Sequence, residues 1–247
     1  MKETIYTIPI NEAFEQRDGC PLCRLRRKLE HDSLDYILGA AMMEPEVRME
    51  TNRKGFCAAH YQTMLGMNRK LSLALTLESR LAQLSQYLDA DMKRASGRGI
   101  GAAKSTRGAL RESAESCYVC SRIAFFEEHY FRNIFHMWKT MPQFHLLLME
   151  QPYFCLSHAA KLMNLAPAAL GKKAGAEFVR IVAEMTKNYL SELSGDVSAF
   201  CKSFDYRSSG VVLRADQKAA PERAIEFLSG YRDASGTDGT QNTGTQV

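Results

Sequence analysis

The chain of 247 residues lacks the features that would assign it at once to a membrane, secreted or fibrous class. None of its apolar runs approaches the roughly 18–20 residues that a membrane helix needs. No apolar segment follows Lys2, so we expect no signal peptide, no membrane span and a cytoplasmic location. Patterns typical of strands occur only in two short stretches, residues 5–10 and 211–213.

Sequence signatures of common catalytic sites are also missing. The stretch GRGIGAAKS (97–105) resembles a phosphate-binding loop, but Ala103 stands where the glycine before the lysine belongs. The sequence contains no His-Glu-x-x-His, no Glu-x-x-His and no Gly-x-Ser-x-Gly. It therefore gives no support for catalysis.

A large excess of charge of one sign is absent too. Lys and Arg number 32 and Asp and Glu 28, which leaves a net charge of +4. A basic run, Arg24 to Lys28, follows the first Cys-x-x-Cys, but the second such motif has no matching run. We interpret the run as a solvated helix face, and we do not expect nucleic-acid binding.

What the sequence does contain is the pattern of long amphipathic helices. Apolar residues recur mainly at intervals of three and four, or their sums, in two segments. Pro221 and Gly230 frame a short helix over 222–228, and Gly195 is expected to bend or end the later long helix. These patterns predict an all-α fold. The two stripes are Leu71, Leu75, Leu81, Leu84, Leu88 and Met92, then Phe178, Ile181, Met185, Tyr189, Leu193, Val197, Phe200 and Phe204.

Composition divides the chain into five parts. Gly, Ser and basic residues make 97–109 a flexible linker, and 233–247 has the composition of a disordered tail. The linker separates two helical repeats, 1–96 and 110–207, and 208–232 forms a C-terminal extension with the short helix.

The two repeats are defined by one motif that occurs twice. Cys20-x-x-Cys23 is followed after 33 residues (24–56) by Cys57-x-x-His60. Cys117-x-x-Cys120 is followed after 34 residues (121–154) by Cys155-x-x-His158, and a phenylalanine precedes each Cys-x-x-His. Glu30 and Glu127 also coincide between the copies. We infer an internal duplication.

Three cysteines and a histidine are a standard ligand set for structural Zn²⁺. Pro21 makes Cys20 the expected N-cap of a helix, and Cys57 is the expected N-cap of another, which helps their thiols to ionise. We therefore predict two zinc ions per chain, each held within one repeat and each clamping two helix N-termini. Iron–sulfur clusters are the alternative. The predicted ligands are Cys20, Cys23, Cys57 and His60 in the first repeat, and Cys117, Cys120, Cys155 and His158 in the second.

Other candidate residues have simpler interpretations. Cys201 belongs to neither motif, and we expect a core thiol. His31 and His129 are expected to be ordinary helix residues, with support of a metal ligand as the alternative. His136 and His145 flank Trp138, where we expect packing and no cofactor.

The motifs resemble a family of uncharacterised bacterial proteins, a domain of unknown function with paired Cys-x-x-Cys and Cys-x-x-His motifs. The resemblance covers nearly the whole chain outside the linker and the tail, and it implies bacterial origin, a cytosolic location and metal binding, but no activity. It rests on TIPINEAFE, CPLC, MMEPEVR, TNRKGFCAAH, PYFCLSH, FDYR and PERAIEFL.

Two functions are consistent with these residues. The first is a zinc-stabilised helical protein that serves as an interaction or regulatory module with a protein partner. The alternative is a redox or metal-responsive protein that uses iron–sulfur clusters or labile zinc-thiolates.

Overall fold

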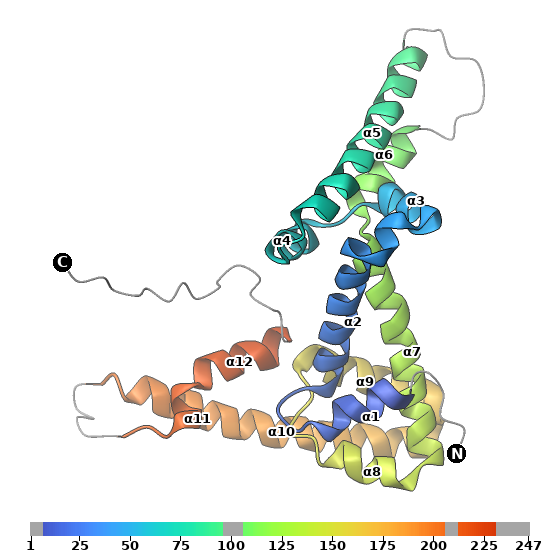
Figure 1. The fold of residues 1–247 in the computed structure, drawn as a ribbon. Helices are drawn as coiled ribbons and strands as arrows, with labels where there is room; N and C mark the ends of the chain where they lie inside the picture. The colour runs from blue at the N-terminus through green and yellow to red at the C-terminus, as the bar shows by residue number, and fades with distance from the viewer. Residues whose placement is uncertain (1–6, 96–105, 206–211, 231–247) are drawn as a thin grey trace, which may run out of the picture. The chain divides into compact units, whose positions relative to one another are not determined.

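The computed structural model describes residues 7–95, 106–205 and 212–230, and the regular elements in these ranges are all helices. This confirms the all-α class, and the strand-like stretch that begins at Ile5 enters a helix at Thr7. Within the described ranges, no helix is both long and apolar enough to cross a membrane. The elements in Figure 1 are α1 (Thr7–Glu15), α2 (Pro21–Leu38), the 3₁₀ helix η1 (Ala40–Met43), α3 (Pro45–Lys54), α4 (Ala58–Gly66), α5 (Lys70–Ala95), α6 (Thr106–Glu115), α7 (Tyr118–Thr140), α8 (Pro142–Met149), α9 (Leu156–Leu170), α10 (Lys172–Lys202), α11 (Ala215–Lys218) and α12 (Ala220–Ser229).

Proline and glycine set several of these helix boundaries. Prolines stand in the first turn of α2, α3, α8 and α12, where their missing N–H has no partner to lose. Gly230 follows α12 with a φ of 73°, in the left-handed region that favours glycine. The helix predicted over 222–228 and its glycine end are thus confirmed.

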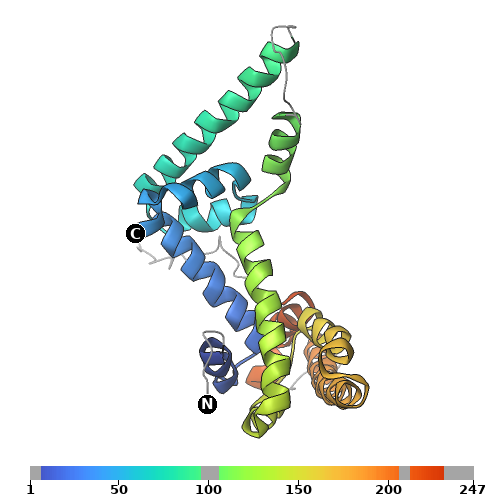
Figure 2. The ribbon, with the colours of Figure 1, turned by 90° about the vertical axis from the view of Figure 1, so that its right-hand side faces the viewer.

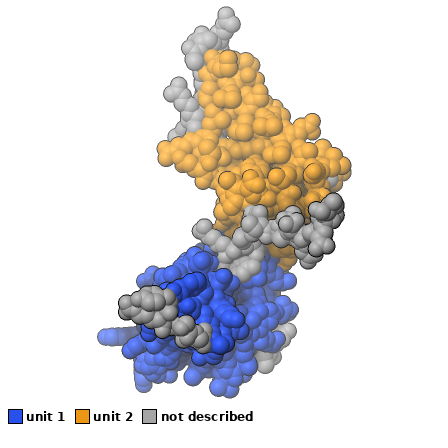
Figure 3. Space-filling model, turned by 90° about the vertical axis from the view of Figure 1, so that its left-hand side faces the viewer, with its two compact units in different colours: residues 1–28, 126–232 blue, residues 29–125, 233–247 orange. Residues whose placement is uncertain are grey.

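The chain divides into two compact units (Figure 3). Unit 1 consists of residues 1–28 and 126–232, and unit 2 contains residues 29–125. Both boundaries fall inside helices, because α2 and α7 are each unbroken (Figure 2). The units therefore do not follow the repeats 1–96 and 110–207 of the sequence. Of the expected linker, 106–109 belong to α6, while 97–105 and the expected tail 233–247 lie outside the described residues.

Unit 1 is built around the hairpin of α9 and α10. Gly171, with a φ of 81°, joins the two helices, and Gly175 lets their backbones approach. The late apolar stripe faces this core, except for Phe204, which is exposed. The expectation that the helix ends at Gly195 is wrong, since α10 continues through it to Lys202.

Unit 2 packs α5 against α3 and α6. The predicted stripe of α5 is largely wrong: four of its six residues are exposed, namely Leu71, Leu81, Leu88 and Met92. Among residues 70–93 of α5, Leu73 and Arg80 are the buried ones. The guanidinium of Arg80 donates to the carbonyls of Asn52 and Arg53 on α3 and of Ser113 on α6. Apolar spacing missed this face because leucines surround α5, and an arginine takes a central place in its packing.

Candidate metal centres

All eight predicted ligands are brought together in two groups, each within one compact unit. Cluster 1, in unit 1, consists of Cys20, Cys23, Cys155 and His158. Cluster 2, in unit 2, consists of Cys57, His60, Cys117 and Cys120. Within each cluster the four ligand atoms lie within 4.8 Å of one another.

The prediction that each repeat supplies its own site is wrong, because the partners are exchanged between the repeats. Each Cys-x-x-Cys meets the Cys-x-x-His of the other copy. Helix length accounts for this: at about 1.5 Å per residue, the 18 residues of α2 lead about 27 Å away from Cys20, and the ten residues of α3, about 15 Å long, are too few to cover that distance. In the second copy, α7 has 23 residues and α8 only eight.

The predicted positions at helix N-termini are confirmed. Cys57 is the N-cap of α4 and Cys155 the N-cap of α9. α2 begins at Pro21 and α7 at Tyr118, each directly after a ligand cysteine. Each cluster therefore joins the starts of two helices, where backbone N–H groups and the helix dipole favour thiolates.

Hydrogen bonds between two loops position the ligands of cluster 2. The backbone N–H of Tyr118 donates to the carbonyl of Gly55 at 2.9 Å, and Ser116 Oγ donates to the carbonyl of Lys54 at 2.9 Å. Gly55 has a φ of 63°, and a Cβ there would lie 2.9 Å from Arg80 Nη2. Only glycine therefore fits between the ligand loop and the buried arginine.

Cluster 1 is supported by contacts between the N-terminal segment and the loop before α9. Gln151 Nε2 donates to the carbonyl of Phe14 at 2.6 Å and to that of Leu147 at 2.8 Å. Arg24 donates to the carbonyls of Ala13 and Gln16. Phe154, fully buried, packs near Phe14 with 6.2 Å between ring centroids. These contacts fix the loops that precede Cys20 and Cys155.

The separations between ligand atoms fit one tetrahedral zinc ion in each cluster. Zn–S bonds of about 2.3 Å and Zn–N bonds of about 2.0–2.1 Å give about 3.8 Å between two sulfurs and about 3.6 Å between sulfur and nitrogen. In cluster 1, Nδ1 of His158 lies 3.5, 3.4 and 3.1 Å from the sulfurs of Cys20, Cys23 and Cys155. In cluster 2, Nδ1 of His60 lies 3.1, 3.3 and 3.6 Å from those of Cys57, Cys117 and Cys120.

The thiols influence one another's ionisation within each cluster. Burial raises the pKa of Cys117, but hydrogen bonding to His60, backbone hydrogen bonds and the charge of His60 together outweigh burial and lower this pKa to about 6. Burial and the neighbouring charge of Cys117 raise the pKa of Cys120 to about 12. In cluster 1, hydrogen bonds from Cys20 and Cys23 lower the pKa of Cys155, while burial, followed by hydrogen bonds to Cys155 and Cys23, raises the pKa of Cys20. A cation is the natural partner of such crowded thiolates.

A glutamate stands behind each ligand histidine. His60 Nε2 lies 2.9 Å from Glu30 Oε1, and His158 Nε2 lies 3.3 Å from Glu127 Oε1. Lys161 also contacts Glu127, at 2.5 Å. Burial raises the pKa of Glu127, but hydrogen bonds from His158 and Lys161 outweigh burial and lower this pKa to about 2. Such carboxylates orient a metal-bound imidazole with Nδ1 toward the ion.

Sequence reasoning did not assign these glutamates a role, although their equal positions in the two copies were a usable signal. Support of a ligand by His31 or His129 was only the alternative to the expectation that both are ordinary helix residues. The side chain of His31 is exposed and lies 3.6 Å from Asp32.

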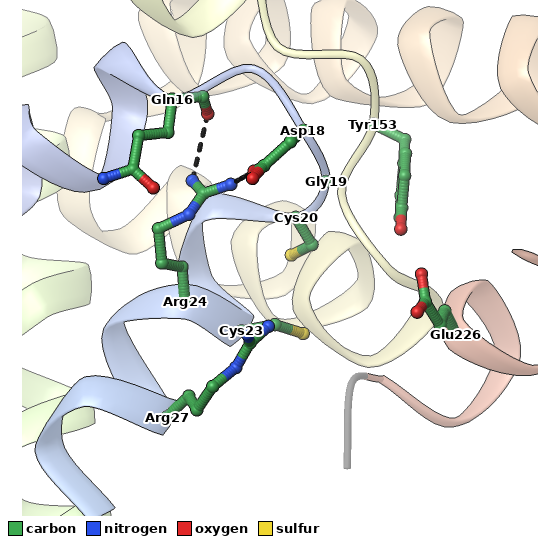
Figure 4. A pocket seen from close by; sticks show the side chains of 9 residues that line it. All are labelled: Gln16, Asp18, Gly19, Cys20, Cys23, Arg24, Arg27, Tyr153 and Glu226. Atoms are coloured by element: carbon green, nitrogen blue, oxygen red, sulfur yellow. Dashed lines mark hydrogen bonds and ion pairs between the residues drawn. The ribbon is translucent and has the colours of Figure 1, made fainter. Parts of the chain in front are cut away.

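A polar pocket of about 280 Å³ adjoins Cys20 and Cys23 (Figure 4). Tyr153 and Glu226 of α12 form one wall, and Arg24 and Arg27 of α2 form another. Arg24 also pairs with Asp18 at the rim. The first arginine of the basic run thus has a structural role in the loop before cluster 1.

The expectation for Cys201 is wrong and that for His145 is confirmed. Cys201 is exposed and is therefore not a core thiol. The interpretation of His145 as packing is confirmed, since its ring stacks on Trp138 with 3.8 Å between centroids.

Comparison with known proteins gives relatives without an assigned activity. A family model described as a family of unknown function (DUF6062) matches residues 1–235. The chain is also similar to an uncharacterised 23.9 kDa protein in the xynA 3' region of Caldicellulosiruptor sp. (strain Rt8B.4). That protein is 20% identical over 219 residues, which cover 89% of this chain and 98% of the relative. No solved structure matches.

Proposed function

Because the chain belongs to the DUF6062 family, whose function is unknown, we propose a function from the geometry of its two clusters. We propose that the protein is a zinc protein in which cluster 1 and cluster 2 each hold one structural Zn²⁺. The ions cross-link helix starts that lie far apart in the sequence, so each unit owes part of its stability to its metal.

The convergence of four donors on one point carries this proposal. Three sulfurs and one nitrogen lie at tetrahedral separations in both clusters. An iron–sulfur cluster with several irons needs its ligands on different iron atoms, and its cysteines therefore lie farther apart. The close spacing favours a single ion, and the donor set of thiolates and imidazole favours zinc.

Four protein ligands also favour a structural role for the metal. A catalytic zinc keeps one position open for water or substrate, usually beside three protein ligands. Here the bound ion would supply a rigid cross-link, while Glu30 and Glu127 hold the imidazoles in place. We therefore propose that the protein acts as an interaction or regulatory module with a protein partner, and not as a metalloenzyme.

The redox or metal-responsive alternative has one observation in its favour. Cys120 is exposed and Cys57 is half-buried, so the thiolates of cluster 2 are accessible to reagents. Colour separates the metals, because an iron–sulfur protein absorbs visible light and a zinc protein does not.

Elemental analysis of protein purified without chelator and without air tests the proposal. We expect two equivalents of zinc per chain, no iron, and a clear drop in melting temperature when the zinc is removed by a chelator. Metal-free protein with freely titratable thiols and an unchanged melting temperature would contradict it.

A further inference from the structure

The two clusters have the same ligands but different surroundings. All four ligands of cluster 1 are buried: Cys20 is 6% exposed, Cys23 5%, Cys155 0% and His158 4%. In cluster 2, only His60 and Cys117 are buried, whereas Cys57 is half-buried and Cys120 is exposed. One side of cluster 2 is thus open to solvent.

The supporting glutamates differ in the same direction. The side chain of Glu127, behind His158, is 14% exposed, and Lys161 holds it as well. The side chain of Glu30, behind His60, is 35% exposed. The carboxylate behind the ligand histidine is therefore also more accessible in cluster 2.

The C-terminal extension provides cover for cluster 1. Gly230, which directly follows α12, is buried, and a Cβ on this residue would lie 3.6 Å from the sulfurs of both Cys23 and Cys155. The end of α12 thus rests directly on two metal ligands. This cover comes from the C-terminal extension, residues 208–232, which follows the second repeat.

Several contacts hold α12 in this position. Phe227 is 2% exposed and packs against the rings of Tyr153 and Tyr189. Arg223 donates to Asp196 at 2.7 Å and to Glu192 at 3.0 Å, both on α10. The pocket beside Cys20 and Cys23 leaves these thiols only slightly exposed, because Tyr153 and α12 form its wall.

From this asymmetry we propose that cluster 2 is a metal-exchange site, whereas cluster 1 keeps its ion under the cover of α12. The inference rests on the proposed function, since it concerns the exchange of the two proposed ions. Thiophilic divalent cations, Zn²⁺ and Cd²⁺, enter and leave cluster 2 when Cys120 detaches toward solvent and a competing ligand takes its place. Unit 2 responds to the loss of its ion, because Cys117 belongs to its apolar core.

The test uses the full chain loaded with two equivalents of zinc and challenged with an excess of the coloured chelator 4-(2-pyridylazo)resorcinol. We expect one equivalent to leave quickly and the second at least about ten-fold more slowly, since release from cluster 1 requires local opening of α12. Cys120→Ser should remove the fast phase and leave the slow one. Release of both equivalents at one rate, or of cluster 1 first, overturns the proposal.

A second measurement assigns the phases without any ligand variant. During release, aliquots are alkylated with iodoacetamide and analysed by mass spectrometry. We expect Cys57, Cys117 and Cys120 to be modified before Cys20, Cys23 and Cys155. The reverse order contradicts the proposal even if Cys120→Ser does not fold.

The role of α12 is tested by Phe227→Ala, with Leu228→Ala as the matched control, because Leu228 is adjacent and 57% exposed. Phe227→Ala should accelerate the slow phase toward the fast one, and Leu228→Ala should change neither phase. Equal slow phases in both variants would show that α12 does not protect cluster 1. Failure of the proposed function looks different: the purified chain would hold fewer than two zinc ions from the start.

Discussion

At the scale of single residues, a carboxylate behind each histidine is what distinguishes these clusters from four donors that only lie close together. Glu30 and Glu127 reach the Nε2 atoms of His60 and His158, which leaves each Nδ1 directed at the sulfurs. A carboxylate in this place is expected to favour the imidazole tautomer and ring orientation that direct Nδ1 toward an ion.

We expect Glu127→Gln to weaken the zinc affinity of cluster 1 by about 10–100-fold, because the amide no longer provides the negative charge that raises the basicity of His158. Competition with a zinc chelator should show one of the two zinc equivalents bound more weakly. Glu128→Gln is the control. Glu128 lies on an exposed face of α7, where it accepts a hydrogen bond from Arg132 at 2.9 Å. Equal affinities in the two variants would exclude the role of Glu127.

Arg80 also stabilises unit 2, because its buried hydrogen bonds join α5 to α3 and α6. We expect Arg80→Met to lower the free energy of unfolding of unit 2 by about 3 kcal/mol, because the carbonyls of Arg53 and Ser113 lose a charged donor. Hydrogen exchange of α3 and α6 measures the loss.

Arg111→Met is the control for this variant. Arg111 pairs with Glu115 on the surface, at 3.0 Å, so its replacement should change stability by about 0.5 kcal/mol or less. Similar exchange rates in the two variants would show that burial of Arg80 contributes little.

At the scale of elements, close packing of α9 against α10 shapes unit 1. A Cβ on Gly175 would lie 2.8 Å from Pro167 Cα and 3.0 Å from the carbonyl oxygen of Ala166. Gly195, on the same helix, has no such neighbour within 4 Å. The close approach of α9 therefore excludes a side chain at position 175, whereas no neighbouring atom excludes one at position 195.

We expect Gly175→Ala to destabilise unit 1 by about 1–3 kcal/mol, since the new methyl group forces two backbones apart. Gly195→Ala should instead stabilise it by about 1 kcal/mol through helix propensity. Trp138, the single tryptophan of the chain, belongs to unit 1, so its fluorescence during urea unfolding reports both changes. A stabilising Gly175→Ala would show that the hairpin is not closely packed there.

At the scale of the whole molecule, each compact unit combines the Cys-x-x-Cys of one motif copy with the Cys-x-x-His of the other. The unit boundaries lie within α2 and α7, so the described chain leaves unit 1 in α2 and returns to it in α7. Each site therefore takes its ligands from both copies of the motif.

Loss of one ligand tests this exchanged pairing. In Cys57→Ser, we expect Cys117 and Cys120 to become reactive toward iodoacetamide, because cluster 2 loses its ion, while Cys20 and Cys23 stay protected. Mass spectrometry of the zinc-loaded variant identifies the modified thiols. Cys201 is exposed in the folded chain and provides an internal control for labelling. Reaction of Cys20 and Cys23 instead would support pairing within each repeat.

The sequence by itself determined the features that depend on neighbouring residues. Periodicity indicated an all-α protein, proline and glycine marked the helix at Pro221, and the motifs identified eight candidate ligands, with Cys20 expected directly before one helix and Cys57 as the N-cap of another. Each of these follows from interactions over one or two helical turns, which a single sequence displays directly.

Only the tertiary structure decided which ligands share a site. The long helices α2 and α7 lead away from the cysteines at their starts, and packing within each unit brings the Cys-x-x-Cys of one copy to the Cys-x-x-His of the other. The buried face of α5 was decided in the same way, because Arg80 is buried only when the carbonyls of α3 and α6 surround it. Spacing in the sequence measures separation along the chain, whereas ligand geometry depends on the distances that remain after long helices have packed.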